Sequence, residues 1–141
     1  MHNGLPFSIL VVDDDVDDLE IIDEAFKEIG FAAQVKKFLN GRALLHYLNS
    51  LDPTLYPSLI VLDNVLPEMD AHDILITLKE HTAYKDIPVV VYTTMLTPYK
   101  REQLRAKGVS ALLEKGSTMP EVIRLAQELK NLATSKAKTD Q

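Results

Sequence analysis

Short runs of apolar residues alternate along this chain with longer segments in which apolar residues recur every three or four positions. The runs occupy residues 7–12, 33–38, 58–62, 87–92 and 110–114. The first, third and fourth runs are nearly continuous in Val, Ile and Leu, as in strands covered by helices on both faces, whereas the second and fifth are mixed, as in edge strands. The alternation predicts one α/β domain, a doubly wound five-stranded parallel sheet with right-handed crossovers.

The segments between and after the runs have the periodicity of amphipathic helices. The segment at about 98–107 is short and weakly amphipathic, whereas the last helix has a predicted capping box of Thr118 and Glu121 with Pro120 in its first turn. Residues 134–141 have no apolar periodicity and are expected to form a disordered tail. The other apolar faces consist of Val16, Leu19, Ile22, Phe26 and Ile29; Leu44, Leu45, Leu48 and Leu51; Ala71, Ile74, Leu75 and Leu78; and Val122, Leu125, Ala126, Leu129 and Leu132.

Composition narrows the classes of function. The net charge of −6 argues against nucleic acid as the main partner, which would favour a basic surface. The absence of cysteine excludes disulfides, a thiol nucleophile and Cys-ligated zinc. No N-terminal apolar stretch resembles a signal peptide and no apolar run is long enough to cross a membrane, so a cytoplasmic protein with no membrane partner is expected.

Polar side chains stand where the predicted strands end. Asp13 and Asp14 follow the first strand, Asp63 ends the third, Thr93 ends the fourth and Lys115 ends the fifth. Ligands of doubly wound folds bind beyond the carboxyl ends of the strands, so these side chains should converge. Two carboxylates about 4 Å apart repel by roughly 4 kcal/mol at an effective dielectric near 20. Lys115 offsets one charge, and a hard divalent ion such as Mg²⁺ would balance the rest.

Four motifs resemble the receiver domain of two-component response regulators, in the stand-alone form typical of chemotaxis receivers. They are VVDDD at 11–15, LIVLDNVLPEMDA at 59–71, IPVVVYTT at 87–94 and ALLEKG at 111–116, and the match spans about residues 7–133. The resemblance implies a flavodoxin-like fold with strand order 2-1-3-4-5. It also implies that the receiver domain comprises residues 1–133.

The resemblance implies a Mg²⁺ site and a phosphoryl acceptor. Asp14 would coordinate the ion directly and Asp13 largely through water, while Asp63 and the backbone carbonyl of Val65 would complete the protein ligands. Asp63 would also be the nucleophile that accepts the phosphoryl group.

Two further side chains have implied roles around the phosphoryl group. Lys115 would pair with Asp63 before transfer and with the phosphate after it, and Thr93 would turn to hydrogen-bond the phosphate. Val65 and Met95 offer no polar group that could orient an attacking water, so self-dephosphorylation should be slow. The protein would therefore be a switch and not a turnover enzyme.

The resemblance implies that the partners are proteins. The phosphoryl donor would be a sensor histidine kinase or a phosphotransfer protein, and the downstream target would be another chain, because few residues follow the last predicted helix. The face formed by the fourth and fifth helices is the expected surface for a homodimer.

Three residues depart from the family pattern, and one of them is Ala71, which replaces the usual Gly of the MDG sequence. Gly116 stands where the family has a Pro preceded by a cis peptide bond, so the bond between Lys115 and Gly116 is either trans or held cis by its surroundings. Leu112 replaces the aromatic residue whose rotation usually reports phosphorylation. Output through Thr93 alone, or through Tyr92 or Tyr99, is the hypothesis that remains.

The acidic run also has a structural interpretation. Asp is common as a helix N-cap, and Asp13 and Asp14 alone would suit that role. Together with the other strand-end residues they are assigned to the site. Asp15, Asp17 and Asp18 belong to the first helical turn, where negative charge suits the helix dipole, and are assigned to capping and solvation.

A calcium-binding EF-hand is one rival interpretation of the acidic run. Asp13, Asp15, Asp17 and Glu24 match loop positions 1, 3, 5 and 12. However, Asp18 stands where the loop requires Gly, and the run follows a strand and not a helix.

Two other rivals share the strand-end aspartate. A haloacid-dehalogenase-like phosphatase needs a second Asp two residues after its nucleophile, where this chain has Val65. A pseudo-receiver would bind partners without phosphorylation. The full set of functional side chains argues against it, but Gly116 and Leu112 keep this alternative open.

Overall fold

A parallel sheet forms the centre of the molecule in the computed structural model, which describes residues 7–139 and, for 135–139, only the backbone. The described chain contains five strands, all parallel, in the order β2-β1-β3-β4-β5. The predicted fold and strand order are therefore confirmed, with the two mixed runs at the edges. The strands are β1 (Ile9–Val12), β2 (Val35–Phe38), β3 (Leu59–Asp63), β4 (Val89–Thr93) and β5 (Ala111–Glu114).

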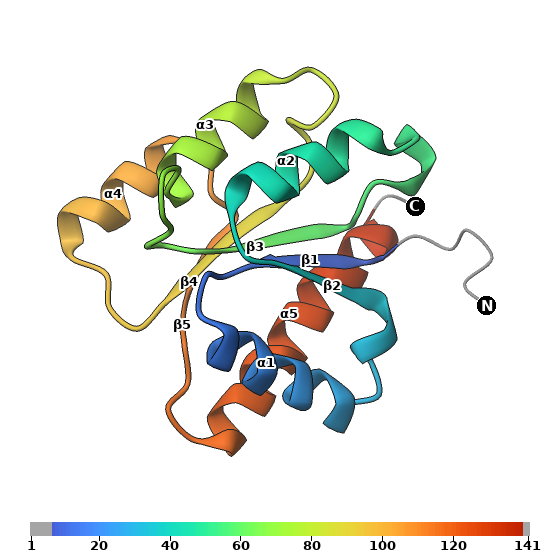
Figure 1. Ribbon diagram of the computed structural model, residues 1–141, viewed down its shortest axis with the longest axis vertical. Helices are drawn as coiled ribbons and strands as arrows, with labels where there is room; N and C mark the ends of the chain where they lie inside the picture. The colour runs from blue at the N-terminus through green and yellow to red at the C-terminus, as the bar shows by residue number, and fades with distance from the viewer. Residues whose placement is uncertain (1–6, 140–141) are drawn as a thin grey trace.

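Helices cover both faces of this sheet. Helices α1 and α5 lie on one face, and α2, α3 and α4 lie on the other (Figure 1). Across the described residues no helix is both long enough and apolar enough to span a membrane. The helices are α1 (Val16–Glu28), α2 (Gly41–Ser50), α3 (Ala71–Glu80), α4 (Pro98–Ala106) and α5 (Met119–Thr139).

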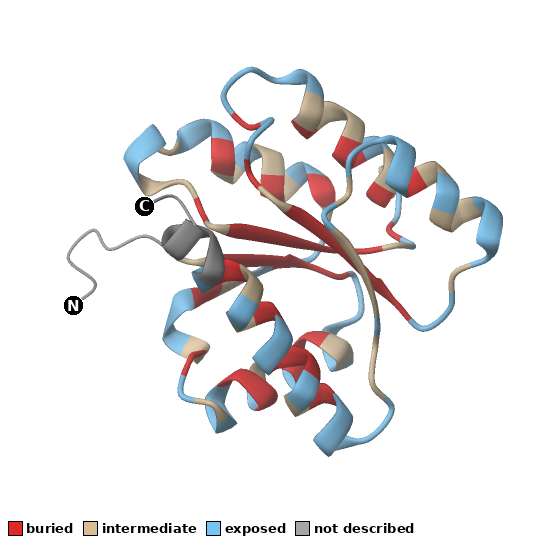
Figure 2. Cartoon of the chain, turned by 180° about the vertical axis from the view of Figure 1, so that it is seen from behind, coloured by how far each residue is buried: buried red, intermediate tan, exposed pale blue. Residues whose placement is uncertain are grey.

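Alternate residues of each central strand face opposite helical layers, which is why these strands are apolar throughout. In β1, Ile9 and Val11 pack in the cluster with α1 and α5, whereas Leu10 and Val12 pack in the cluster with α2 and α3. Figure 2 shows the result, with buried strands between helices whose outer surfaces are exposed. The sheet is therefore a rigid support for whatever lies at its ends.

Helix α1 begins and ends with local signals that the sequence carries. Asp15 is the N-cap, and its side chain accepts hydrogen bonds from the backbone N–H groups of Asp17 and Asp18. At the other end Gly30 has φ of 72°, a left-handed conformation that glycine adopts without steric cost, and its N–H donates to the carbonyl of Lys27. The capping assignment of Asp15 is therefore confirmed.

Helix α5 starts as expected but ends later than expected. The predicted capping box is present, because the N–H of Thr118 donates to Oε1 of Glu121 and the N–H of Glu121 donates to Oγ1 of Thr118. The disordered tail was expected from residue 134, but the helix continues to Thr139. Ala and Lys favour helix, and no Gly or Pro interrupts this stretch. Residues 140–141 of that expected tail lie outside the described residues.

The loop between β5 and α5 packs closely around Gly116. A Cβ atom at this position would lie 2.7 Å from Cβ of Glu121 and 2.9 Å from the backbone N of Val122. Within residues 7–139 there is no cis peptide bond, so the bond between Lys115 and Gly116 is trans. Gly116 is therefore required by the close approach of α5, which leaves no room for a side chain.

Candidate functional site

The parallel ladder brings the predicted strand-end residues to one edge of the sheet. The N–H of Asp13 donates to the carbonyl of Phe38, and the N–H of Lys115 donates to the carbonyl of Thr93, so the ladder continues one residue beyond β1 and β5. Asp63 is the last residue of β3 and Thr93 the last of β4. Strand ends that are far apart in sequence therefore lie next to one another.

Three carboxylates form an acidic cluster at this edge. One carboxylate oxygen from each of Asp13, Asp14 and Asp63 lies within 4.8 Å of the other two. Asp13 and Asp63 are buried, whereas Asp14 is exposed. These are hard oxygen donors, open to solvent on one side, and they fit a divalent cation such as Mg²⁺, which binds one or two carboxylates and keeps several waters.

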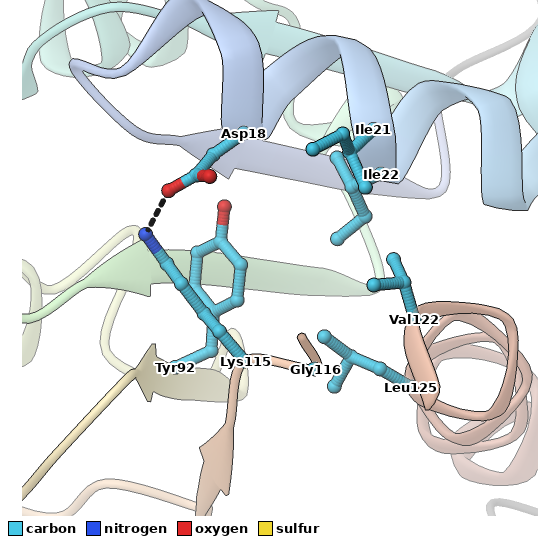
Figure 3. A pocket seen from close by; sticks show the side chains of 8 residues that line it. All are labelled: Asp18, Ile21, Ile22, Tyr92, Lys115, Gly116, Val122 and Leu125. Carbon is cyan, nitrogen blue, oxygen red and sulfur yellow. Dashed lines mark hydrogen bonds and ion pairs between the residues drawn. The ribbon is translucent and has the colours of Figure 1, made fainter. Parts of the chain in front are cut away.

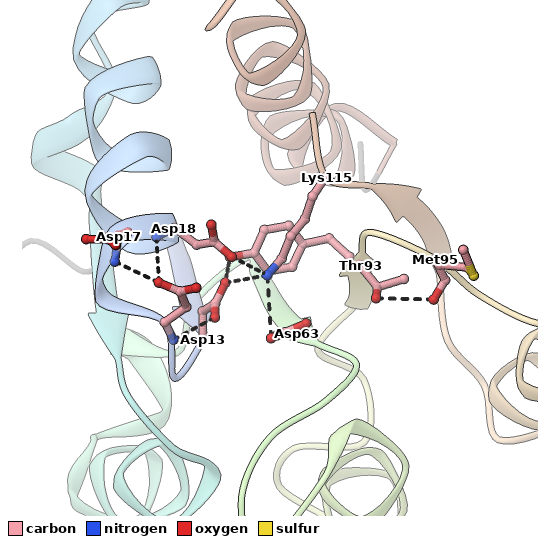
Figure 4. A network of polar contacts seen from close by, with 9 residues as sticks. Asp13, Asp17, Asp18, Asp63, Thr93, Met95 and Lys115 are labelled. Atoms are coloured by element: carbon pink, nitrogen blue, oxygen red, sulfur yellow. Dashed lines mark hydrogen bonds and ion pairs between the residues drawn. The ribbon is translucent and has the colours of Figure 1, made fainter. Parts of the chain in front are cut away.

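Lys115 neutralises part of this charge. Its Nζ lies 2.8 Å from Oδ2 of Asp13, 2.8 Å from Oδ2 of Asp18 and 3.5 Å from Oδ2 of Asp63 (Figure 4). Burial alone would lower the pKa of Lys115, but the hydrogen bonds to Asp13 and Asp18 and the charges of Asp13 and Asp63 outweigh it. The pKa of Lys115 therefore lies above its ordinary value, and the side chain is cationic at neutral pH.

Burial acts to raise the pKa of Asp63, whereas it acts to lower the pKa of Lys115. Desolvation raises the pKa of Asp63 to about 6, the charge of Lys115 works against this rise, and the negative charge of Asp13 adds to it. At neutral pH Asp63 is mostly an ionised carboxylate, but it is held in surroundings that penalise its charge. Such a group has a strong electrostatic preference for an added cation.

Thr93 is near the cluster but turned away from it. Its hydroxyl donates a long hydrogen bond of 3.4 Å to the carbonyl oxygen of Met95. Figure 4 shows this bond pointing away from Lys115 and Asp63. A bond of this length is weak, so the hydroxyl can rotate toward a new acceptor at Asp63 at little cost.

The rim of the site is apolar. The side chains of Val65 and Met95, in the loops after β3 and β4, are 71% and 75% exposed. Val65 has no hydrogen-bonding side-chain group, and Met95 offers only a weak thioether acceptor, so neither would hold a water molecule firmly beside Asp63.

Asp18 is a site residue that sequence reasoning missed. It was assigned only to capping and solvation of α1, but its carboxylate forms an ion pair with Lys115 across 97 positions of sequence. No sequence signal separates Asp18 from Asp17, because both are acidic residues of the first helical turn. The direction of α1 relative to β5 decides which of the two contacts Lys115.

Tyr92 is a second residue whose position was not foreseen. Its ring is buried, and its hydroxyl donates a hydrogen bond of 2.6 Å to Oδ2 of Asp13. Burial, followed by this hydrogen bond and the charge of Asp13, raises the pKa of Tyr92 well above its usual range. A tyrosine in a buried strand needs a partner for its hydroxyl, and that requirement is the signal that could have identified it. Tyr99, by contrast, is exposed on α4.

Cavities border the site on several sides, and one of about 490 Å³ is lined by Lys115, Gly116 and Glu121. A cavity of about 40 Å³ lies between α1 and α5 beside Lys115, and Asp18, Tyr92 and Gly116 contribute to its wall (Figure 3). Its size suits ordered water and not an organic ligand. Another cavity of about 210 Å³ lies near α4, with Thr93 and Leu112 in its lining. The leucine that replaces the expected aromatic residue thus borders open space next to Thr93.

Comparison with known proteins gives consistent matches. A family model described as the response regulator receiver domain matches residues 9–127. The chain is 30% identical over 127 residues to the probable methanogenesis regulatory protein FilR2 of Methanothrix harundinacea, covering 89% of this chain and 82% of that protein. It is 32% identical over 92 residues to response regulator Rcp1 of Synechocystis sp., covering 63% of each.

Solved structures agree with the sheet order. The Mn²⁺-bound form of response regulator Rcp1 matches with a TM-score of 0.74 at 25% identity, covering 89% of this chain and 93% of that one. The phosphorylated cyanobacterial phytochrome response regulator RcpA matches with a TM-score of 0.80 at 23% identity, covering 93% and 96%. The second likeness supports the fold alone.

Proposed function

The chain belongs to the response regulator receiver domain family, and from that membership we propose that it is a phosphorylation switch whose acceptor is Asp63. The donor is the phosphohistidine of a sensor histidine kinase or a phosphotransfer protein. The observation that carries the proposal is the juxtaposition of a three-carboxylate cluster with a lysine ammonium 3.5 Å from Asp63. Receiver domains are signalling modules and not turnover enzymes, and we assign this chain the same role.

Mg²⁺ is the cofactor of the proposed reaction. Asp14 would hold the ion directly and Asp13 largely through water, with Asp63 and the backbone carbonyl of Val65 completing the protein ligands. The donor set supports this assignment, because three hard oxygens lie within 4.8 Å of one another. The Mn²⁺-bound state of Rcp1 supports a divalent site in a related protein. When bound, the ion supplies positive charge that reduces repulsion between Asp63 and an anionic phosphoryl group.

The residues of this chain position and neutralise the transferred group. A carboxylate oxygen of Asp63 forms the new P–O bond while the P–N bond to the donor histidine breaks. The donor imidazole, protonated on its other ring nitrogen, keeps the electron pair and leaves as neutral histidine. Lys115 balances the charge of the product, and Thr93 exchanges its long bond with Met95 for a bond to a phosphoryl oxygen. Phosphoryl transfer depends mainly on such positioning and charge neutralisation, which these side chains supply without a further acid or base.

The phosphorylated state is read by another protein. The product carries up to about two negative charges at one strand end, and the rotation of Thr93 carries that change to the region of α4 and β5. Tyr92 is buried against Asp13, so of the two tyrosines only Tyr99 is exposed for direct contact. The face formed by α4 and α5 is the proposed homodimer surface. We place the protein in the cytoplasm on family membership alone.

A radiolabel transfer assay tests the acceptor. Wild-type protein with Mg²⁺ and a phosphorylated kinase should become labelled, and Asp63→Asn should not, because an amide is a poor nucleophile for phosphorus. Asp17→Asn removes the same charge from an exposed position and should be labelled like wild type. Label on Asp63→Asn would contradict the acceptor assignment. Unlabelled wild type with every candidate donor would favour the pseudo-receiver alternative.

A further inference from the structure

The ammonium of Lys115 is shared between carboxylates, and its contact to Asp63 is the longest of those that the described residues make. Its distances are 2.8 Å to Asp13, 2.8 Å to Asp18 and 3.5 Å to Asp63. A lysine ammonium has three N–H donors. Two of them therefore make short bonds to carboxylates other than the proposed acceptor.

The position of Lys115 is fixed from several sides. Its side chain is only 11% exposed, and its Nζ lies 4.8 Å from the centre of the Tyr92 ring. Figure 3 shows Lys115 extending along that ring toward the carboxylate of Asp18. Asp18 itself is held by the first turn of α1, which Asp15 caps. The ion pair between Lys115 and Asp18 is therefore built by two anchored elements.

Asp13 and Asp18 differ in what else they do. Asp13 is buried, accepts the hydroxyl of Tyr92 and belongs to the acidic cluster. Asp18 lies outside that cluster, and its side chain is 35% exposed. Removing the Asp18 carboxylate would thus change the charge around Lys115 without removing a proposed ligand of the cation.

We infer that Asp18 is a positioning residue that holds Lys115 away from the acceptor, so that a phosphoryl group on Asp63 must compete with Asp18 for the ammonium. This inference rests on the proposed function. A phosphoryl group on Asp63 adds negative charge on that side of Nζ, and this charge attracts the ammonium that now lies 2.8 Å from Asp18. The carboxylate of Asp18 thereby lowers the affinity of the site for phosphoryl groups and favours the unphosphorylated state.

The first experiment measures competition directly. Beryllofluoride, an analogue of an acyl phosphate, is titrated calorimetrically into wild type, Asp18→Asn and Asp17→Asn at saturating Mg²⁺. Asp18→Asn should bind about three- to tenfold more tightly than wild type, as expected for loss of a half-exposed ion pair. Asp17→Asn removes the same charge from the same helical turn without touching Lys115, and should stay within about twofold of wild type.

The second experiment observes the ion pair in the absence of metal and analogue. In protein labelled with ¹⁵N and ¹³C, the Nζ of Lys115 should show a hydrogen-bond scalar coupling to the carboxylate carbon of Asp18. That coupling should persist in Asp17→Asn and disappear when beryllofluoride and Mg²⁺ are added. A merely structural role of Asp18 would not produce this exchange.

The outcomes separate the two proposals. Any one of three results would overturn the role of Asp18 alone. These are equal beryllofluoride affinities of wild type and Asp18→Asn, an equal gain in affinity in Asp17→Asn, and a scalar coupling to Asp18 that persists when beryllofluoride is bound. Failure of beryllofluoride to bind any of the three proteins at saturating Mg²⁺ would overturn the proposed function, and the role of Asp18 with it.

Discussion

Asp63 lies where its own charge is unfavourable. Burial raises its pKa from 3.8 to about 6 despite the attraction of Lys115, and Asp13 adds repulsion. The folded protein therefore holds a proton on Asp63 more tightly than the unfolded chain does. Between about pH 4 and pH 6 the folded state binds more protons, so stability falls as pH rises through this window.

Asp63→Asn should abolish this loss of stability in metal-free protein. Between pH 4 and pH 7 the free energy of unfolding of wild type should fall by about 2–3 kcal/mol more than that of the variant. Urea unfolding in the presence of a chelator measures both curves. Other carboxylates titrate in both proteins, so parallel curves would contradict the raised pKa of Asp63.

The apolar rim should make the phosphorylated state persistent. Val65 and Met95 cannot orient a water molecule for attack on the phosphoryl group, so decay of radiolabelled wild type should take minutes or longer. Val65→Asn introduces a hydrogen-bonding group at the same exposed position and should accelerate decay by about tenfold. Val65→Leu is the apolar control and should decay like wild type. A wild-type lifetime of only seconds would show that the rim does not limit hydrolysis.

At the scale of elements, the loop before α5 explains the departure at Gly116. The family pattern suggested that a proline was missing, whereas the structure shows a position where any Cβ would meet the backbone of α5. The close approach of α5 to this loop is a packing feature that no short motif encodes.

Gly116→Ala should therefore destabilise the protein. The added Cβ forces α5 or the loop to move, which costs about 1–3 kcal/mol of unfolding free energy. Ser117→Ala, at the next and exposed position, removes only the hydrogen bond from Oγ of Ser117 to Oε1 of Glu121 and should cost less, at most about 1 kcal/mol. Both are measured by urea unfolding at one pH. A Gly116→Ala protein as stable as wild type would mean that the loop adapts without strain.

The elements themselves were largely predictable, and their ends were less so. Apolar stripes identified α1, α2, α3 and α5, whereas α4 was expected from a short and weakly amphipathic segment. Side-chain caps such as Asp15 and Thr118 marked where two of the helices begin. The end of α5 was missed because apolar periodicity stops at residue 133, whereas helix propensity does not. Apolar periodicity identifies only the residues that pack against another element, and a helix can extend beyond the last of those residues.

At the scale of the whole molecule, topology made the acidic cluster predictable. Parallel strands place their carboxyl ends at one edge, so Asp13, Asp14 and Asp63 meet whatever the details of side-chain packing. The ion pair of Asp18 with Lys115, by contrast, depends on the positions of α1 and β5. Those positions result from the packing of many side chains and have no local sequence signal.

Mg²⁺ should stabilise the folded protein as a whole. An ion that binds the assembled cluster and not the unfolded chain adds about 1.4 kcal/mol at ten times its dissociation constant. For a domain of this size the corresponding rise in Tm is about 3–6 °C. Asp14→Asn removes an exposed carboxylate of the cluster and should abolish most of the rise, while Asp17→Asn should keep it. Thermal scans with and without Mg²⁺ decide this, and an equal rise in all three proteins would place the ion elsewhere.

Helices α1 and α5 lie side by side on one face of the sheet (Figure 1), although they are the first and last helices of the described chain. A ribosome adds roughly 5–20 residues per second, so α5 is synthesised on the order of 5–20 s after α1. Until then the apolar face of α1 cannot pack against α5. During that interval the nascent chain exposes Leu19, Ile22 and Phe26, which makes it a candidate client of chaperones. Lys115 is also translated just before α5. Under the proposed function, the new protein can therefore accept a phosphoryl group only in the step that completes its fold.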